Sequence, residues 1–178
     1  MTRRPPRWTR RLFAWRKLPR RQRARRAAAA IGFVLLTLLW LYAQGDHDER
    51  DATWKRRDIL DALRWVESSG RPDDKVPDGD DGLAIGPYQI HRVYWQDAHT
   101  YDPALGGAYQ DCRVRAYAER VIDAYMRRHA TEAWRLGKAE RLARTHNGGP
   151  TGHLKRATEG YWRRVRARLP APNPKPDR

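Results

Sequence analysis

The hydrophobic positions of the chain follow two different patterns, and the change occurs near residue 45. Residues 27–44 (AAAAIGFVLLTLLWLYAQ) form a run of 18 residues without a charged side chain. Such a run lies at the lower end of the roughly 17–25 residues that cross a bilayer as a helix. Trp40 and Tyr42 lie near its far end, where interfacial aromatic residues are expected. The pattern therefore predicts a transmembrane helix over 27–44.

Beyond this run the apolar residues recur at the spacing of amphipathic helices. Ile59, Leu63 and Val66 fall at i, i+4 and i+7 and predict a helix over 56–69, which Gly70 and Pro72 end. A wider stripe predicts a helix over 108–129 that forms the buried centre of the domain; the stripe consists of Val114, Tyr117, Ala118, Val121, Ile122, Tyr125 and Met126. The same periodicity predicts further helices over 132–144 and 154–169.

Residues 71–85 break the helical pattern, because they are rich in Asp, Gly and Pro. We expect a loop there that could contain a small hairpin, followed by a turn at Gly86–Pro87 and a short helix that ends near Gln96. The predicted fold class is mainly α, with one small irregular or β lobe and a single transmembrane helix before it. A domain over 55–169 is long enough to bury its own core.

The charge distribution adds an orientation to this picture. The first 26 residues hold 12 of the 37 Lys and Arg residues and no acid, so the remaining 25 basic residues face 21 acidic ones and give about +4. A basic arm can bind nucleic acid, but beside an apolar run the positive-inside rule places it in the cytoplasm. We therefore expect no nucleic-acid partner and an inner-membrane protein, single-pass, with its domain outside the cytoplasm.

The resulting domain boundaries are 1–26 for a basic arm, 27–44 for the anchor, 45–54 for a linker, 55–169 for the folded domain and 170–178 for a proline-rich tail. A cleaved signal peptide is the main alternative to an anchor. The basic region is long for a signal peptide, and the residues after the apolar run make a poor cleavage site. We therefore expect the segment to stay attached.

Cysteine and histidine usage excludes several kinds of chemistry. Cys112 is the single cysteine and cannot form an internal disulfide, so core packing must hold the domain together. The six histidines are scattered and show no metal-ligand spacing. The sequence therefore predicts no metal and no cofactor.

Carboxylates are the remaining candidates for catalysis. Glu67 ends the helix over 56–69 beside Trp65 and Val66, and both an apolar setting and a helix C-terminus raise the pKa of a glutamate. A second carboxylate must come from the loop that follows, which contains Asp73, Asp74, Asp78, Asp80 and Asp81. Paired carboxyl groups are typical of enzymes that hydrolyse glycosidic bonds. Their separation decides between retention and inversion, and the sequence leaves that open.

Further residues are candidates for binding a sugar. Tyr88, Tyr94 and Trp95 could stack on pyranose rings, although Trp95 could equally belong to the core. Gln89 and Asn147 offer amide groups, and His146 beside Asn147 is a further candidate for binding. Gly148 lets the backbone approach a ligand closely. Asn147 could instead cap a helix before a glycine turn.

The order of these motifs resembles the invertebrate-type lysozyme family, also called destabilase. The resemblance covers most of residues 58–168 and rests on the segments 67–70 (ESSG), 86–90 (GPYQI), 94–95 (YW), 146–150 (HNGGP) and 161–162 (YW). It implies a lysozyme-like α+β fold and cleavage of the β-1,4 bond between N-acetylmuramic acid and N-acetylglucosamine. Glu67 matches the catalytic glutamate of the family. Asp80 fits the family aspartate if one residue is deleted before Gly86, and Asp78 is the second choice.

The chain departs from the family in its cysteines. Animal members carry many disulfides, whereas this chain has Ser69, Ile85 and Ala98 at such positions. We therefore expect a disulfide-free, membrane-anchored bacterial member that acts as a peptidoglycan-degrading muramidase. The alternatives are a lytic transglycosylase that needs Glu67 alone and a non-catalytic module that binds the cell wall. Some family members also resemble isopeptidases, for which Ser68 and Ser69 are the available serines.

Overall fold

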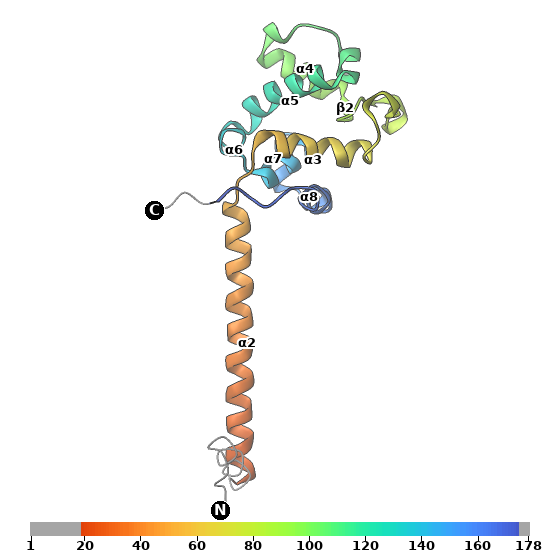
Figure 1. Cartoon of the computed structure of the whole chain (residues 1–178). Helices are drawn as coiled ribbons and strands as arrows, with labels where there is room; N and C mark the ends of the chain where they lie inside the picture. Colours follow the sequence, from red (N-terminus) through yellow and green to blue (C-terminus); the bar gives the residue numbers. More distant parts are fainter. Residues whose placement is uncertain (1–18, 175–178) are drawn as a thin grey trace, which may run out of the picture. The chain divides into compact units, whose positions relative to one another are not determined.

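The computed structural model describes residues 19–174, so the first 18 residues of the expected arm and the end of the expected tail lie outside it. The chain forms two compact units, Met1–Glu49 and Arg50–Arg178. The described part of the first unit belongs to one helix, α2 (Arg20–Asp51), drawn in orange in Figure 1. Helix α2 continues through much of the segment 45–54 that the sequence suggests is a linker.

The predicted transmembrane helix is wrong. Within the described residues, the structure contains no helix that is both long enough and apolar enough to cross a bilayer. Residues 27–44 are the middle of the 32-residue helix α2, which begins in arginines and ends in charged residues. The uncharged run is thus one part of a longer, partly charged helix and not a separate apolar span.

The second unit is mainly helical, as predicted. Its helices are α3 (Arg56–Ser68), α4 (Arg92–Tyr101), α5 (Arg115–His129), α6 (Thr131–Leu136), α7 (Ala139–Gly148) and α8 (Glu159–Arg166). Helix α5 contacts α4, α6 and α7, and it supplies the centre of the core. Its residues Ala118, Val121, Ile122 and Met126 are fully buried, which confirms most of the predicted stripe, but Val114, the first residue of that stripe, is 60% exposed.

Several helix boundaries differ from the predicted ones. The short helix expected to end near Gln96 is α4, which continues to Tyr101. The predicted helix over 108–129 starts as the 3-10 helix η4 (Tyr109–Arg113), and Val114 then adopts an extended conformation before α5 begins. The predicted helix over 154–169 consists of η5 (Gly152–Leu154), η6 (Arg156–Thr158) and α8. Leu154 therefore does not join the apolar face of α8 and is 74% exposed.

Gly137 divides the predicted helix over 132–144 into α6 and α7. Its φ of +70° is left-handed, and a Cβ at this position would lie 2.1 Å from the carbonyl oxygen of Trp54. The backbone of Trp54 also donates a hydrogen bond to the Gly137 carbonyl at 3.0 Å. A side chain is excluded here because the start of the domain packs against this turn.

The irregular lobe lies between α3 and α4 and contains the expected hairpin. It consists of η1 (Asp73–Lys75), η2 (Asp80–Gly82) and the short antiparallel strands β1 (Ala84–Ile85) and β2 (Ile90–His91). At Gly86, which begins the turn, φ is +73° and a Cβ would lie 2.1 Å from the carbonyl oxygen of Cys112. This close approach fixes the hairpin against η4.

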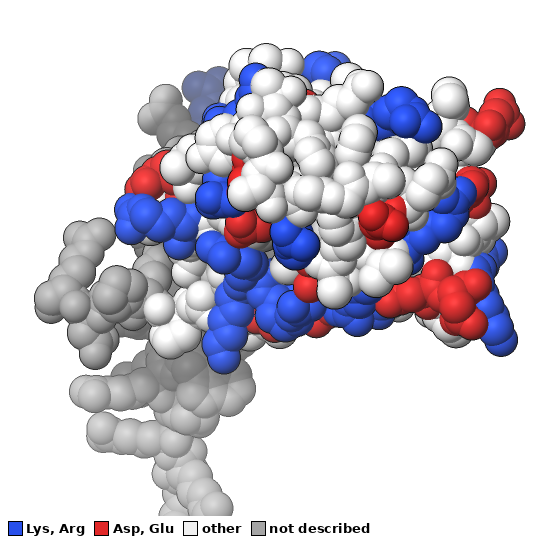
Figure 2. All heavy atoms as spheres, turned by 90° about the horizontal axis from the view of Figure 1, so that it is seen from above, with Lys and Arg blue, Asp and Glu red and all other residues white. Residues whose placement is uncertain are grey.

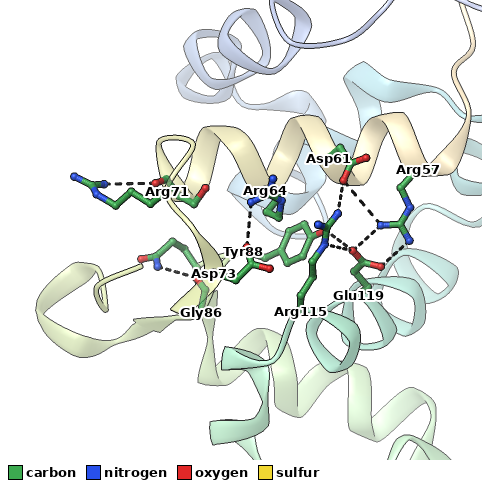
Figure 3. A network of polar contacts seen from close by, with 11 residues as sticks. Arg57, Asp61, Arg64, Arg71, Asp73, Gly86, Tyr88, Arg115 and Glu119 are labelled. Atoms are coloured by element: carbon green, nitrogen blue, oxygen red, sulfur yellow. Dashed lines mark hydrogen bonds and ion pairs between the residues drawn. The ribbon is translucent and has the colours of Figure 1, made fainter. Parts of the chain in front are cut away.

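Charged side chains of both signs are interspersed over the face of the domain seen in Figure 2. One cluster of them joins the hairpin turn to two helices (Figure 3). Glu119 of α5 accepts hydrogen bonds from Arg57 of α3 at 2.8 and 2.9 Å, from Arg115 at 2.9 Å and from the Tyr88 hydroxyl at 2.8 Å. Burial alone would raise the pKa of Glu119, but these donors outweigh it and lower the pKa to about 2.

Candidate active site

A cavity of about 290 Å³ opens where the end of α3 meets the irregular lobe, the start of α4 and the end of α7. Four predicted site residues from separate elements contribute to its wall: Glu67 from α3, Asp80 from η2, Tyr94 from α4 and His146 from α7. The other lining residues are Ala84, Gln89, Ile90, His91 and Asn147. The fold thus gathers six of the nine residues that the sequence suggests for the site.

Glu67 lies in the last turn of α3, and its side chain is only 19% exposed. The Tyr161 hydroxyl donates a hydrogen bond to Glu67 Oε1 at 2.7 Å. Burial is the largest influence on this carboxyl and raises its pKa to about 7, whereas the Tyr161 hydrogen bond and the charge of Arg164 oppose the shift. The negative charge of Asp80 also raises the pKa of Glu67. The direction expected from the sequence agrees with this result.

Asp80 is the acidic-loop residue that faces the cavity. It has a left-handed φ of 49°, its side chain is 69% exposed, and Oδ2 lies 3.0 Å from His91 Nε2. Asp78, the second choice from the sequence, forms an ion pair with Arg113 and does not line the cavity. The neighbouring Asp81 does not line it either.

His146 lies beside Glu67 but does not form an ion pair with it. Its Nε2 is 3.7 Å from Glu67 Oε1, and its side chain is 4% exposed. Burial lowers the pKa of His146 to about 4, although a hydrogen bond with the Tyr88 backbone opposes this. The imidazole is therefore neutral at the pH at which Glu67 titrates, and it forms a polar, uncharged wall.

The two amide side chains have different roles. Gln89 directs its Nε2 to the carbonyl oxygens of Gly86 and Pro77 at 2.9 and 3.1 Å, so its amide nitrogen braces the hairpin. Asn147 lies within α7, one residue before the helix ends, and its exposed side chain lines the cavity. Gly149, and not Asn147, is the C-cap of the helix.

Tyr94 is the one predicted aromatic residue that reaches the cavity. Its ring stacks on Tyr125 with a centroid distance of 3.6 Å, and its hydroxyl lies 3.4 Å from His146 Nδ1. The ring is only 8% exposed. Tyr94 therefore forms part of the cavity floor and does not offer a free face to a sugar.

Tyr88, Trp95 and Gly148 lie outside the cavity, in contrast to the expectation from the sequence. The Tyr88 ring is fully buried beneath α3, since the Gly86–Pro87 turn directs it inward (Figure 3). Trp95 packs against the core and donates a hydrogen bond from Nε1 to the Tyr117 hydroxyl at 3.0 Å. Gly148 contacts Lys155, whose Nζ donates to its carbonyl oxygen at 2.6 Å.

The sequence reasoning missed three residues that act on the carboxyl groups: Tyr161, Arg164 and His91. Tyr161 is 94 positions from Glu67, and the sequence indicates it as part of the 161–162 (YW) segment but not as a partner of Glu67. Arg164 lies one turn after it and lies over its ring. His91 follows the GPYQI segment, and its position directly after the hairpin was the available signal.

The other candidate nucleophiles lie apart from the cavity or are protected. Ser68 is fully buried, and Ser69 caps α3 in a left-handed conformation; neither lines the cavity. Cys112 is buried, and burial raises the pKa of its thiol to about 12. No cluster of three or more potential metal ligands occurs in the part of the chain that the structure describes.

Comparisons with known proteins show which family the chain resembles. The family model described as Destabilase matches residues 67–168, a range that contains all the cavity-lining residues. Lysozyme 1 from Crassostrea virginica is 42% identical over 47% of this chain and 44% of its own length. Invertebrate-type lysozyme 6 from Caenorhabditis elegans is 31% identical over 64% of this chain and 87% of its own length.

A solved structure of inhibitor-bound lysozyme from Meretrix lusoria is also similar. It has a TM-score of 0.51 and 30% identity, and the match covers 65% of this chain and 91% of that chain. The match to the Crassostrea virginica protein, by contrast, spans less than half of that protein's length. Because the family model covers more than half of this chain, the predicted family is confirmed. The chain belongs to the destabilase family, that of the invertebrate-type lysozymes.

Proposed function

We propose that the domain is a muramidase that hydrolyses the β-1,4 bond between N-acetylmuramic acid and N-acetylglucosamine in peptidoglycan. The observation that carries the proposal is the pair of unlike carboxyl groups in one cavity. Glu67 is buried with a pKa of about 7, whereas Asp80 is exposed at the cavity wall. Two carboxyl groups in different environments are what glycoside hydrolysis requires. The similarity to proteins named lysozyme supports the same reaction.

In this proposal Glu67 is the general acid. Because its pKa is near 7, a large fraction of Glu67 is protonated near neutral pH and can donate a proton to the leaving oxygen. Tyr161 holds the carboxyl in place, and the neutral His146 beside it does not compete as an ion-pair partner. Asp80 supplies the negative charge that stabilises the positive charge developing on the sugar, or attacks it directly.

The first test compares variants of the full chain on purified peptidoglycan. Because Glu67→Gln removes the proton donor, we expect kcat/KM to fall by about 10²- to 10⁴-fold. Asp80→Asn removes the negative charge of the second carboxylate, and we expect kcat/KM to fall by at least about 10²-fold. Asp81→Asn is the matched control, since Asp81 has a similar left-handed φ of 55° but lies outside the cavity, and it should retain full activity.

Product analysis by mass spectrometry distinguishes the alternatives. A hydrolase releases fragments with reducing ends, and these should disappear with Glu67→Gln. Products with 1,6-anhydro ends, together with an active Asp80→Asn variant, would instead establish a lytic transglycosylase that uses Glu67 alone. Binding of glycan strands without any turnover would contradict the enzymatic proposal and indicate a wall-binding module. A location outside the cytoplasm is part of the same proposal, because peptidoglycan lies there.

A further inference from the structure

His91 contacts the second carboxylate of the cavity from the opposite side of the hairpin. Its Nε2 lies 3.0 Å from Asp80 Oδ2, and both residues line the cavity that holds Glu67. The His91 side chain is 44% exposed, and its Nε2 lies beside Asp80. This distance is that of a close polar contact between an imidazole nitrogen and a carboxylate oxygen.

The register of the hairpin creates this contact. His91 pairs with Ala84 across β1 and β2, and Ala84 in turn forms a bridge with Gly79. The backbones of Gly79 and Ala84 exchange hydrogen bonds at 2.8 and 3.1 Å. Asp80 follows Gly79 directly, so three adjacent backbone segments bring its side chain next to that of His91. A shift of register by one residue would turn His91 to the other face.

The position of the Asp80 carboxylate depends on this contact more than the positions of the neighbouring carboxylates do. It lies in a 3-10 turn with a left-handed φ of 49°. Among the described residues, His91 has the one side chain within ion-pair distance of this carboxylate. Asp78 two residues earlier is held instead by an arginine, Arg113. A carboxylate that must face a reacting sugar loses much of its effect when it moves by about 1 Å.

We propose that His91 is a positioning residue that fixes the Asp80 carboxylate toward the reacting sugar, an inference that rests on the proposed muramidase function. The charged and titratable groups around this contact are Glu67 from α3, Tyr94 from α4 and His146 from α7. None of these three forms a hydrogen bond or an ion pair with Asp80 in the structure. Arg92, beside His91, lies over the ring of Tyr109. His91 is therefore the residue through which the hairpin controls Asp80.

Kinetics of full-chain variants test this role. We expect His91→Ala to lower kcat by about 10- to 100-fold while KM stays within about two-fold, because the contact orients a reacting group and does not bind substrate. His91→Gln places an amide N–H near the position of Nε2 and should restore most of the activity. An equal loss in both variants, or a loss confined to KM, would overturn the proposal.

A double-mutant cycle separates positioning from a purely structural role. If His91 acts through Asp80, then His91→Ala should cause no further loss of kcat in the Asp80→Asn background. Independent losses that multiply would show that His91 has a separate effect and would overturn the proposal. Thermal unfolding of each variant shows whether a loss of kcat comes from a loss of folded protein. If His91→Ala is unfolded, the cycle is measured with His91→Gln in its place.

A spectroscopic measurement keeps this inference distinct from the proposed function. The ¹⁵N chemical shifts of the His91 ring report whether Nε2 carries a hydrogen-bonded proton. They should change in Asp80→Asn and stay the same in Asp81→Asn. An inactive wild-type protein would overturn the muramidase proposal. If the ¹⁵N chemical shifts of His91 are unchanged in Asp80→Asn, the positioning role is overturned even in an active enzyme.

Discussion

At the scale of single residues, the environment of Glu67 determines what the site can do. The carboxyl is buried, and burial raises its pKa to about 7. The Tyr161 hydrogen bond works against this shift because a hydroxyl donor stabilises the ionised form. The pKa of Glu67 is therefore set by desolvation and the charge of Asp80, which raise it, against the Tyr161 hydrogen bond and the charge of Arg164, which lower it. It can be altered by a substitution that leaves Glu67 in place.

Tyr161→Phe tests that balance. Without the hydroxyl, the ionised form of Glu67 loses a donor, so its pKa should rise and the basic limb of the pH profile of kcat/KM should move up by roughly one pH unit. The measurement is a pH–rate profile on peptidoglycan fragments. Tyr117→Phe is the control, because its hydroxyl bonds to Trp95 away from the cavity and its loss should leave the profile unchanged. A downward shift in Tyr161→Phe would contradict this account.

The sequence contained part of the site but not its supporting residues. Glu67 and the direction of its pKa shift were predictable, because a glutamate at an apolar helix end needs only local information. The hydrogen bond from Tyr161 joins positions that are 94 residues apart, so no local pattern reveals it. The contact of His91 with Asp80 depends on the hairpin register, and the position of His91 after the GPYQI segment was its one local signal. For Tyr88 the local pattern was misleading. Its motif predicted a contact with a sugar, but the turn directs the ring into the core.

At the scale of elements, the Glu119 cluster ties the hairpin turn to α3 and α5 (Figure 3). Through Tyr88 it holds the strand pair whose far end carries His91. The predicted helices were correct where the apolar period was unbroken, as in α3 and α5. They failed at Val114, Gly137 and Leu154, where tertiary contacts or backbone conformation end a helix that the period alone would continue.

Glu119→Gln should weaken this connection in a pH-dependent manner. The folded-state pKa of Glu119 is about 2, below its ordinary value of 4.5, so the carboxylate contributes stability above pH 4.5 that is lost as pH falls toward 2. At pH 7 we expect the variant to lose about 2 kcal/mol of unfolding free energy, and less at pH 3. Denaturant unfolding at both pH values measures this. Glu132→Gln is the control: it disrupts an exposed ion pair with Arg135 and should leave the free energy of unfolding unchanged at both pH values. Equal losses of unfolding free energy at the two pH values in Glu119→Gln would contradict the prediction.

At the scale of the whole molecule, the domain retains the family fold without any disulfide. Ile85 and Ala98 are buried in the core, so apolar packing holds the chain together at these two positions. The cavity of the candidate site lowers the stability of the fold, because it keeps the carboxyl group of Glu67 away from water. A stability difference between the wild type and a neutral variant should reveal that cost.

Glu67→Gln should stabilise the fold at high pH. The folded-state pKa of about 7 exceeds the ordinary 4.5, so the wild type loses stability as pH rises from 4.5 through about 7. Glutamine mimics the protonated form and avoids this loss. We expect the variant to gain about 3 kcal/mol of unfolding free energy at pH 8 and little at pH 4. Chemical unfolding at the two pH values provides the comparison, and a variant that is less stable than the wild type at pH 8 would contradict the assignment.

The most direct measurement is a titration of the Glu67 carboxyl by ¹³C NMR, with Glu67→Gln used to assign the resonance. The account predicts a midpoint near pH 7 that coincides with the basic limb of the pH profile of kcat/KM. A midpoint near the ordinary value of 4.5, or a basic limb that persists unchanged in a residually active Glu67→Gln variant, would show that Glu67 is not the acid.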